Sequence, residues 1–279
     1  MKPRMHTDKH GCGVDVRRRR SGLLGPVRKI VALSIFCASA MGYASAAEIR
    51  CLFPLAFKSS LGEVVPQFEK STGNTVAIDY ATIGALTARL KTGEIADVAI
   101  VSGEQFAELQ QEGKLVANTR IDVAKLGDGA FVRRGLPKPD ISSVEAFKRT
   151  LLAAKAITYI DPAAGAPSAI YMARLMERLG IGDQMNAKTR LATGSGKALF
   201  DIVVNGDAEI GFIQITELLA EPTVELLGPL PAAVQDYTKS AAGLVAAGKQ
   251  PDAGKALITF ITSPATLAVM KQRGFEPLK

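Results

Sequence analysis

The chain has 279 residues, 47% of them apolar, with 34 lysines and arginines against 27 acidic residues. Nine of these basic residues and two of the acidic ones precede position 47, which leaves 25 of each sign in residues 47–279. The two histidines, His6 and His10, also lie before position 47, and the chain has no tryptophan. A neutral segment of this kind excludes the basic surface that nucleic-acid binding requires, so we expect no nucleic-acid partner.

Residues 1–46 have the pattern of a secretory signal peptide. The basic run Arg17 to Arg20 precedes a mostly apolar stretch from Ile30 to Met41, and Ala44-Ser45-Ala46 forms a small-x-small cleavage site. The apolar stretch is about a dozen residues long, whereas a membrane span needs roughly 20. We therefore expect an exported protein that begins near Ala47 and resides in the periplasm.

Cysteine and metal chemistry are poorly represented after the cleavage site. Cys51 is the one cysteine left, and it lies in an apolar segment that predicts a buried, unreactive thiol. Residues 47–279 contain no histidine and no dense carboxylate loop, so the sequence predicts neither a metal site nor a cofactor.

The remaining sequence alternates between strand and helix patterns in chain order. Apolar periodicity predicts strands at 48–53, 75–80, 97–101, 157–160 and 209–213, and helices at 60–70, 84–91, 105–111, 169–179, 197–204 and 252–262. Repeated βαβ units predict an α/β fold with mainly parallel sheets flanked by helices. Such sheets bind ligands at the carboxyl ends of their strands.

Four loops at these strand ends carry serine, threonine or glycine just before a helix. They span residues 54–60, 81–84, 161–168 and 193–197. Free backbone N–H groups at a helix start can hold an anion without a cationic side chain. Each loop alone is also typical of ordinary helix capping, but four of them in one exported α/β chain favour an anion site.

Several segments resemble the periplasmic solute-binding proteins of bacterial ABC importers, and among them the molybdate-binding family. They include Phe68-Glu69-Lys70-Ser71-Thr72-Gly73, Leu86-Thr87-Ala88-Arg89-Leu90-Lys91-Thr92-Gly93, Asp161-Pro162 and Asn205-Gly206-Asp207-Ala208-Glu209-Ile210-Gly211. The resemblance implies a type II periplasmic binding fold, in which two lobes joined by two hinge crossovers close on an anion. Lobe I would comprise residues 47–127 plus 240–279, and lobe II residues 128–239. The implied partner is an ABC permease in the inner membrane, and the implied protein is a monomer and not an enzyme.

The family's ligand positions can be placed on this sequence. The two serine positions fall on Ala56 and Ile83, the two backbone donors near Ser168 and Gly196, and the tyrosine position on Gln214. Three hydroxyls of the family pattern are therefore missing. Other donors close to these positions are Lys58, Ser59, Thr82 and Lys197.

These departures leave several functions open. The first is a receptor that captures a molybdate- or tungstate-type oxyanion and delivers it to a permease, or, as a sensory subunit, presents its ligand-bound form to a membrane sensor. The alternative is the same clamp with its site changed to bind an organic carboxylate, because each missing hydrogen bond to a charged group costs about 1.5–3 kcal/mol. The third is an enzyme on a related scaffold with Lys58 or Lys197 as nucleophile or base, which would require a strongly lowered lysine pKa.

Overall fold

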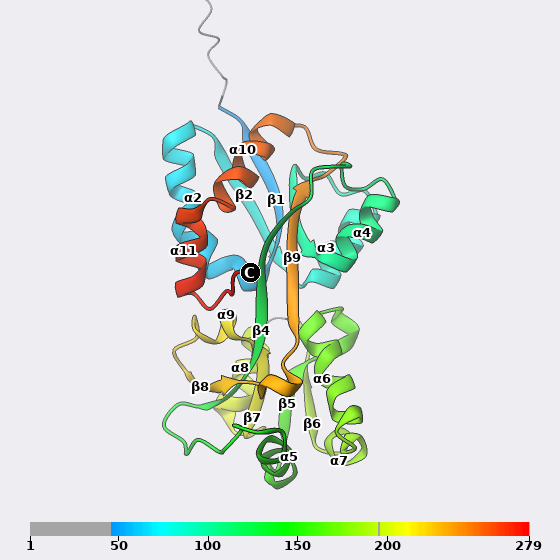
Figure 1. Ribbon diagram of the computed structural model, residues 1–279, viewed down its shortest axis with the longest axis vertical. Coiled ribbons are helices and arrows are strands. Elements are labelled where there is room, and N and C mark those ends of the chain that lie inside the picture. The colour runs from blue at the N-terminus through cyan, green and yellow to red at the C-terminus, as the bar shows by residue number, and fades with distance from the viewer. Residues whose placement is uncertain (1–45, 195, 279) are drawn as a thin grey trace, which may run out of the picture. The chain divides into compact units, whose positions relative to one another are not determined.

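The computed structural model describes residues 46–194 and 196–278 (Figure 1). All but the last residue of the predicted signal peptide lies outside the described residues. Every predicted strand and helix is present, with bounds that differ by at most two residues. The α/β fold class is therefore confirmed.

The first group of strands forms a mixed sheet in the order β2-β1-β3-β9-β4. Its strands are β1 (Glu48–Pro54), β2 (Thr75–Ala81), β3 (Val98–Ser102), β9 (Tyr237–Leu244) and the first half of β4 (Ile121–Arg133). The β1–β2 and β1–β3 pairs are parallel, as βαβ units require, whereas β9 is antiparallel to both β3 and β4.

Helices cover both faces of this sheet. They are η1 (Leu55–Phe57), α2 (Lys58–Thr72), α3 (Ile83–Lys91), α4 (Gly103–Gln111), α10 (Pro251–Ile261) and α11 (Pro264–Gln272). In Figure 1, α2, α10 and α11 lie on one side of the strands and α3 and α4 on the other. The core divides in the same way, with a cluster around Phe57 and Phe68 on the first side and one around Phe106 on the second.

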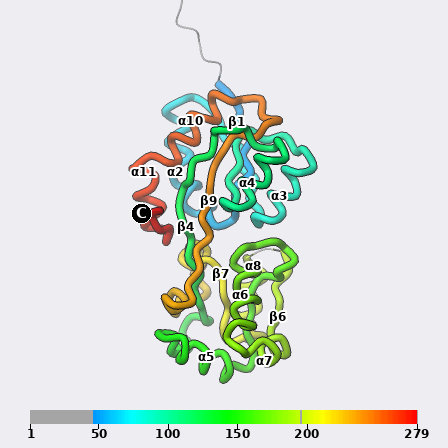
Figure 2. Tube along the Cα trace, turned by 45° about the vertical axis from the view of Figure 1, so that its right-hand side comes forward, coloured from blue at the N-terminus to red at the C-terminus, as the bar shows by residue number. Residues whose placement is uncertain are grey.

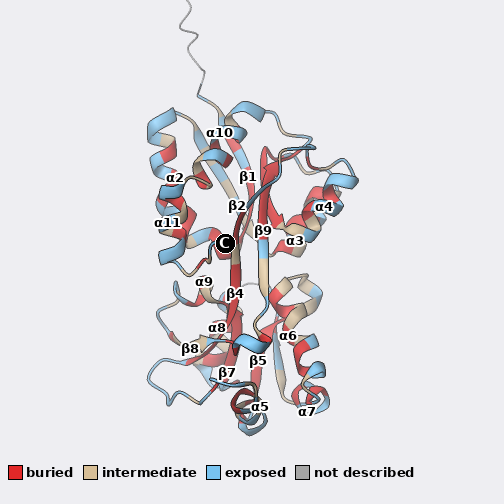
Figure 3. Ribbon diagram, viewed as in Figure 1, coloured by how far each residue is buried: buried red, intermediate tan, exposed pale blue. Residues whose placement is uncertain are grey.

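The second group of strands is built on β6-β5-β7-β4, with β8 on the other side of β4. Its elements are α5 (Val144–Ala153), β5 (Ile157–Ile160), η2 (Pro162–Ala164), α6 (Pro167–Arg178), α7 (Gly182–Asn186), β6 (Thr189–Ala192), α8 (Gly196–Asn205), β7 (Ile210–Gln214), α9 (Ile215–Leu218), β8 (Val224–Pro229) and η3 (Ala232–Val234). One core cluster fills this group, and its phenylalanines pack in edge-to-face pairs such as Phe147 with Phe212. Figure 3 shows the buried residues gathered along the strands and the inner helix faces.

Strands β4 and β9 connect the two groups, running side by side in both ribbon and tube views (Figures 1 and 2). Gly127 pairs with Tyr237 in the first sheet, and the next residue, Asp128, pairs with Gln214 in the second. We propose this step as the first lobe crossing, and we keep the names lobe I and lobe II with the boundaries given above. Both sheets contain antiparallel pairs that the sequence analysis did not predict. These pairs involve β4, β8 and β9, three strands that were not expected.

Two smaller predictions can be checked in the same structure. Cys51 is confirmed as a buried free thiol on β1, and burial raises its pKa well above the usual range, so the unreactive thiol form is favoured. In the described part of the chain no single helix is long and apolar enough to span a membrane. Only α10 and α11 taken together meet that test by length and composition, and they are bent by 57°.

Candidate functional site

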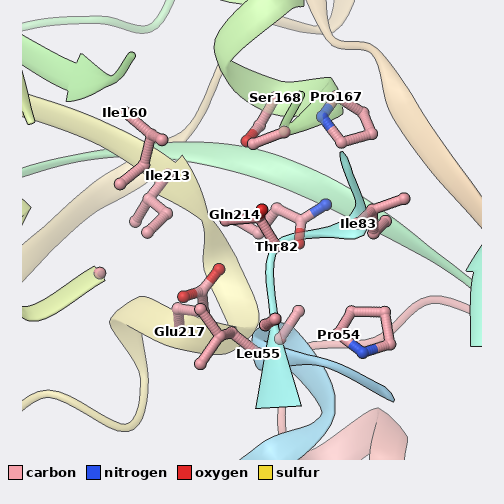
Figure 4. A pocket seen from close by; sticks show the side chains of 14 residues that line it. Pro54, Leu55, Thr82, Ile83, Ile160, Pro167, Ser168, Ile213, Gln214 and Glu217 are labelled. Carbon is pink, nitrogen blue, oxygen red and sulfur yellow. The ribbon is translucent and has the colours of Figure 1, made fainter. Parts of the chain in front are cut away.

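A cleft between the carboxyl ends of the two groups of strands collects most of the predicted loops (Figure 4). Fourteen residues line it: Pro54, Leu55, Ala56, Ala81, Thr82, Ile83, Ile160, Ala166, Pro167, Ser168, Gly196, Ile213, Gln214 and Glu217. They come from η1, the starts of α3, α6 and α8, and the turn from β7 into α9. The sequence predicted this meeting of strand ends because parallel strands bring their carboxyl ends to one edge.

The start of helix α3 is preorganised by its N-cap. The Thr82 hydroxyl accepts a hydrogen bond from the backbone N–H of Ala85 and donates one to the carbonyl oxygen of Ala164, at 3.3 and 3.1 Å. The second bond crosses from lobe I to lobe II. The N–H group of Ile83, which lines the cleft, has no partner among the described residues, as expected for the first turn of a helix, and can bind an anion.

Helix α6 offers the matching donor from lobe II. Pro167 occupies its first position, where the missing N–H costs nothing, and Ser168 follows with a backbone N–H that has no partner among the described residues. Ser168 is buried, with 8% of its surface exposed, and its side chain faces the cleft. Ser168 can therefore present an N–H and a hydroxyl together.

The turn after β7 adds an amide and a carboxyl. Gln214 is buried at the end of the strand, and Glu217 follows one turn later on α9. Figure 4 shows the Glu217 carboxyl pointing into the cleft beside Ile213 and Leu55. Glu217 is the one ionisable residue among those that line the cleft, and its burial raises the pKa of its carboxyl to about 7. The site thus holds a residue that can be charged or neutral near pH 7.

The first residue of lobe II places a second carboxyl behind the cleft. Asp128 is 4% exposed, and its Oδ1 has no hydrogen-bond partner among the described residues. Burial, with smaller contributions from Asp236 and Glu217, raises the pKa of Asp128 to about 8. Asp128 is therefore mostly protonated at pH 7, so this carboxyl adds little charge behind the cleft.

The lobes touch at two glycines beside the cleft. A Cβ atom on Gly84 would lie 2.6 Å from both the carbonyl oxygen of Ala164 and the Cα of Gly165, and a Cβ on Gly165 would lie 2.8 Å from the Cα of Gly84. Gly165 also has a φ of +68°, which favours glycine. This approach of two backbones, together with the Thr82 to Ala164 hydrogen bond, brings α3 against the loop before α6.

The structure brings together six of the nine predicted site residues and leaves three outside. Those that line the cleft are Ala56, Thr82, Ile83, Ser168, Gly196 and Gln214. Lys58 and Ser59 lie on the first turn of α2 and do not line it, with Lys58 exposed. Lys197 points away because its Nζ pairs with Asp201 at 2.6 Å, one helical turn on, and its side chain is 77% exposed. The predicted gain of lysine donors in the cleft is therefore corrected.

Glu217 is the residue that the sequence analysis missed. A signal was present, since Glu217 lies three residues after Gln214, within one turn of the strand end where a family ligand position falls. Its importance depends on α9 beginning immediately after β7, which the sequence pattern did not predict. For metals, the described residues contain no group of three or more histidines, cysteines or acidic residues that could hold an ion.

Comparisons with known proteins agree with this architecture. A family model for bacterial extracellular solute-binding proteins matches residues 50–276. Aconitate isomerase of Pseudomonas sp is 31% identical over 225 residues, which cover 78% of this chain and 84% of that protein. The molybdate-binding protein ModA of Azotobacter vinelandii is 24% identical over 238 residues, covering 83% and 91%. The solved structure of the periplasmic molybdate-binding protein of Azotobacter vinelandii has a TM-score of 0.69 at 19% identity, covering 83% of this chain and all of that one. This last likeness shows the type II periplasmic binding fold.

Proposed function

We propose, because the chain belongs to the bacterial extracellular solute-binding proteins and is of the ModA type, that it binds a small organic carboxylate in the cleft between its lobes. We further propose that it acts in the periplasm as a monomer after export, and that its closed form delivers the ligand to an ABC permease. Closure on the anion would give the permease a form that differs from the empty one.

The observation that carries the choice of ligand is the Glu217 carboxyl in a cleft without a lining cation. Two like unit charges about 4 Å apart repel by about 4 kcal/mol at an effective dielectric constant near 20. A compact, doubly charged oxyanion such as molybdate would meet this repulsion whenever Glu217 is ionised. An organic acid can instead place its carboxylate at the N–H groups of Ile83 and Ser168, with its carbon skeleton between Glu217 and the isoleucines of the cleft.

The relatives support the same choice. The protein that is 31% identical to this chain is named for aconitate, an unsaturated tricarboxylate, and it matches at higher identity than the molybdate-binding relative. The cleft also lacks the hydroxyls that the molybdate-binding pattern places at positions 56 and 83, where this chain has Ala56 and Ile83.

A second candidate function is isomerisation of the bound acid. Its support is the name of the same relative together with an ionisable side chain inside the cleft. Moving a double bond next to a carboxylate needs a group that takes and returns a proton, and no metal or cofactor. Capture and isomerisation would use one site and one class of ligand.

Thermal stabilisation and calorimetry on residues 47–279 test both candidates. The ligands are molybdate, tungstate, sulfate, citrate and cis- and trans-aconitate, with sodium chloride at matched ionic strength as control. A ligand at 100 times its Kd should add about 2.7 kcal/mol to the free energy of unfolding. We expect carboxylates to stabilise the protein, and a response to molybdate and tungstate alone would overturn the proposal. Proton NMR of each aconitate isomer with the protein then distinguishes binding alone from turnover.

A further inference from the structure

One side chain in the cleft has the chemistry of a general base. The other polar lining side chains are the hydroxyls of Thr82 and Ser168 and the amide of Gln214, none of which titrates near neutral pH. The lysines considered as bases from the sequence do not line the cleft. Glu217 therefore has no competitor among the described lining residues.

The half-buried side chain of Glu217 lies against the start of α8. Its Oε2 lies 3.0 Å from where a Cβ on Gly196 would be, so the carboxyl rests against the first turn of α8. Any larger residue at position 196 would press on this carboxyl. Burial is the sole cause of the raised pKa of Glu217, with no contribution from a hydrogen bond or ion pair with a described residue. These features are unlike those of a structural glutamate, which is typically paired.

We propose that Glu217 is the catalytic residue that removes and returns a proton on an unsaturated carboxylic acid bound in the cleft. This assignment rests on the isomerisation described under the proposed function. Burial of the Glu217 carboxyl supports it, because a pKa of about 7 gives the base the proton affinity that transfer near neutral pH requires.

The chemical step balances without a further reactant. A Glu217 oxygen takes a proton from the methylene next to the double bond, so a C–H bond breaks and an O–H bond forms. The released electron pair spreads over the three allylic carbons and the attached carboxylate. Glu217 then returns the proton to the far allylic carbon, which moves the double bond by one position. The bond that was single becomes the new double bond, so the conformation about it when the proton is removed decides whether the product is cis or trans.

Both lobes contribute to holding the charge during this step. The N–H groups of Ile83 from α3 and of Ser168 from α6 have no partner among the described residues and belong to helix starts, which favour negative charge. Electron density that moves onto a substrate carboxylate would be stabilised by these donors. Ile160 and Ile213 exclude water from the carbon skeleton.

Charged groups around α9 set the background for a pH profile. Asp128 on β4 is the nearest in effect, since its own pKa is raised in part by Glu217. Other charged groups on neighbouring elements are paired or exposed. Glu225 pairs with Lys138 and Lys197 with Asp201, whereas Asp236 and Lys58 are exposed. A rate that depends on an ionised base should therefore rise with pH and level off above about 7.

The test compares Glu217→Gln and Glu217→Asp with the intact protein and with Glu221→Gln, the same chemical change just beyond α9 and outside the cleft. Readouts are calorimetric affinity for the tricarboxylate of the proposed function, its isomer ratio by NMR, and deuterium entry into its allylic positions in D2O. We expect Glu217→Gln to bind within about threefold of the intact protein but to lose at least about 100-fold in rate of isomerisation and exchange. Glu217→Asp should keep part of the rate, and Glu221→Gln all of it.

The outcomes separate the two proposals. An intact protein that binds none of the carboxylates refutes the proposed function itself. Binding without isomerisation or exchange leaves capture standing and overturns the role of Glu217. Turnover that persists in Glu217→Gln, or a pH profile that is the same in that variant, overturns the assignment while isomerisation stands.

Discussion

The two faces of the cleft differ in what they offer a ligand. The face from lobe I consists of Pro54, Leu55, Ala56, Ala81, Thr82 and Ile83, and its one polar side chain, Thr82, already donates to a carbonyl of lobe II. The face from lobe II supplies a hydroxyl, an amide and a carboxyl from Ser168, Gln214 and Glu217. On the proposed function, this difference predicts that lobe II selects the ligand by side-chain chemistry, whereas lobe I covers it with apolar surface and backbone N–H groups.

The buried aspartates of the two lobes also differ from each other. Asp97 in lobe I accepts hydrogen bonds from the backbone N–H groups of Arg50, Lys249 and Gln250, at 2.7 to 2.8 Å, and so ties β1 and β3 to the start of α10. Asp128, the first residue of lobe II, is equally buried but has an unpartnered oxygen. Asp97 therefore stabilises the fold through its hydrogen bonds. Asp128, which lies on the strand that joins the lobes, lowers the free energy of unfolding whenever it ionises.

The largest effect should come from removing the ionisable group of Asp128. Its folded pKa of about 8 lies above the ordinary 3.8, so the folded state holds a proton that the unfolded state has released. The free energy of unfolding then falls as pH rises from about 4 to about 8, by about 1.4 kcal/mol per pH unit. Urea denaturation at pH 6 and pH 8 measures how far the free energy of unfolding falls between these two pH values. We expect this fall to be about 2–3 kcal/mol smaller in Asp128→Asn than in the intact protein. If the free energy of unfolding falls equally in both proteins, ionisation of Asp128 does not destabilise the fold, and Asp128 does not differ from Asp97 in this respect.

The next effect tests the contribution of lobe II to binding. Ser168→Pro removes the free N–H at the second position of α6, where proline is tolerated because no intrahelical bond is lost. Losing one hydrogen bond to a charged ligand should weaken affinity by about 1.5–3 kcal/mol, or roughly ten- to 150-fold. Ser168→Ala keeps the N–H and separates its effect from that of the hydroxyl. If calorimetry finds that Ser168→Pro binds the ligand as tightly as Ser168→Ala, the backbone N–H of residue 168 does not contact the ligand.

Closure by lobe I can be tested at Gly84, which contacts lobe II but does not line the cleft. An alanine at Gly84 would collide with the backbone of Ala164 and Gly165 across the cleft. We expect Gly84→Ala to fold normally but to bind about tenfold more weakly, since the closed form loses about 1.4 kcal/mol. Gly62→Ala is the matched control, because Gly62 lies on α2 with no atom within 4 Å of the added carbon, and alanine should add about 0.5–1 kcal/mol there. Unchanged affinity in Gly84→Ala would mean that closure does not need this contact.

The sequence predicted most of the scaffold for physical reasons, and six of the residues that it proposed for the site line the cleft. Period-2 and period-3.6 patterns are local, and helix starts at strand ends follow from them, so Thr82, Ile83 and Ser168 were found. Strands β4 and β9 were missed because they are long, antiparallel and paired across more than 100 residues of sequence. Side-chain direction was the second limit. Lys197 and Gly196 are adjacent in sequence, yet one faces an aspartate in solvent and the other faces the cleft.

The smallest expected effect tests whether Lys197 lies outside the ligand site, as its position in the structure indicates. If Lys197 contacted the ligand, replacing it would remove a charge-assisted bond and weaken affinity by at least tenfold. The ion pair with Asp201 is exposed and spaced four residues apart, so Lys197→Met should instead cost about 0.3–0.5 kcal/mol of stability and leave affinity within about twofold. Asp201→Asn breaks the same pair while keeping the lysine, so both variants should lose similar stability if the pair is all that Lys197 provides. Affinity that falls in Lys197→Met and holds in Asp201→Asn would return the lysine to the cleft, and the ligand would then be selected by charge as well as by hydrogen bonds.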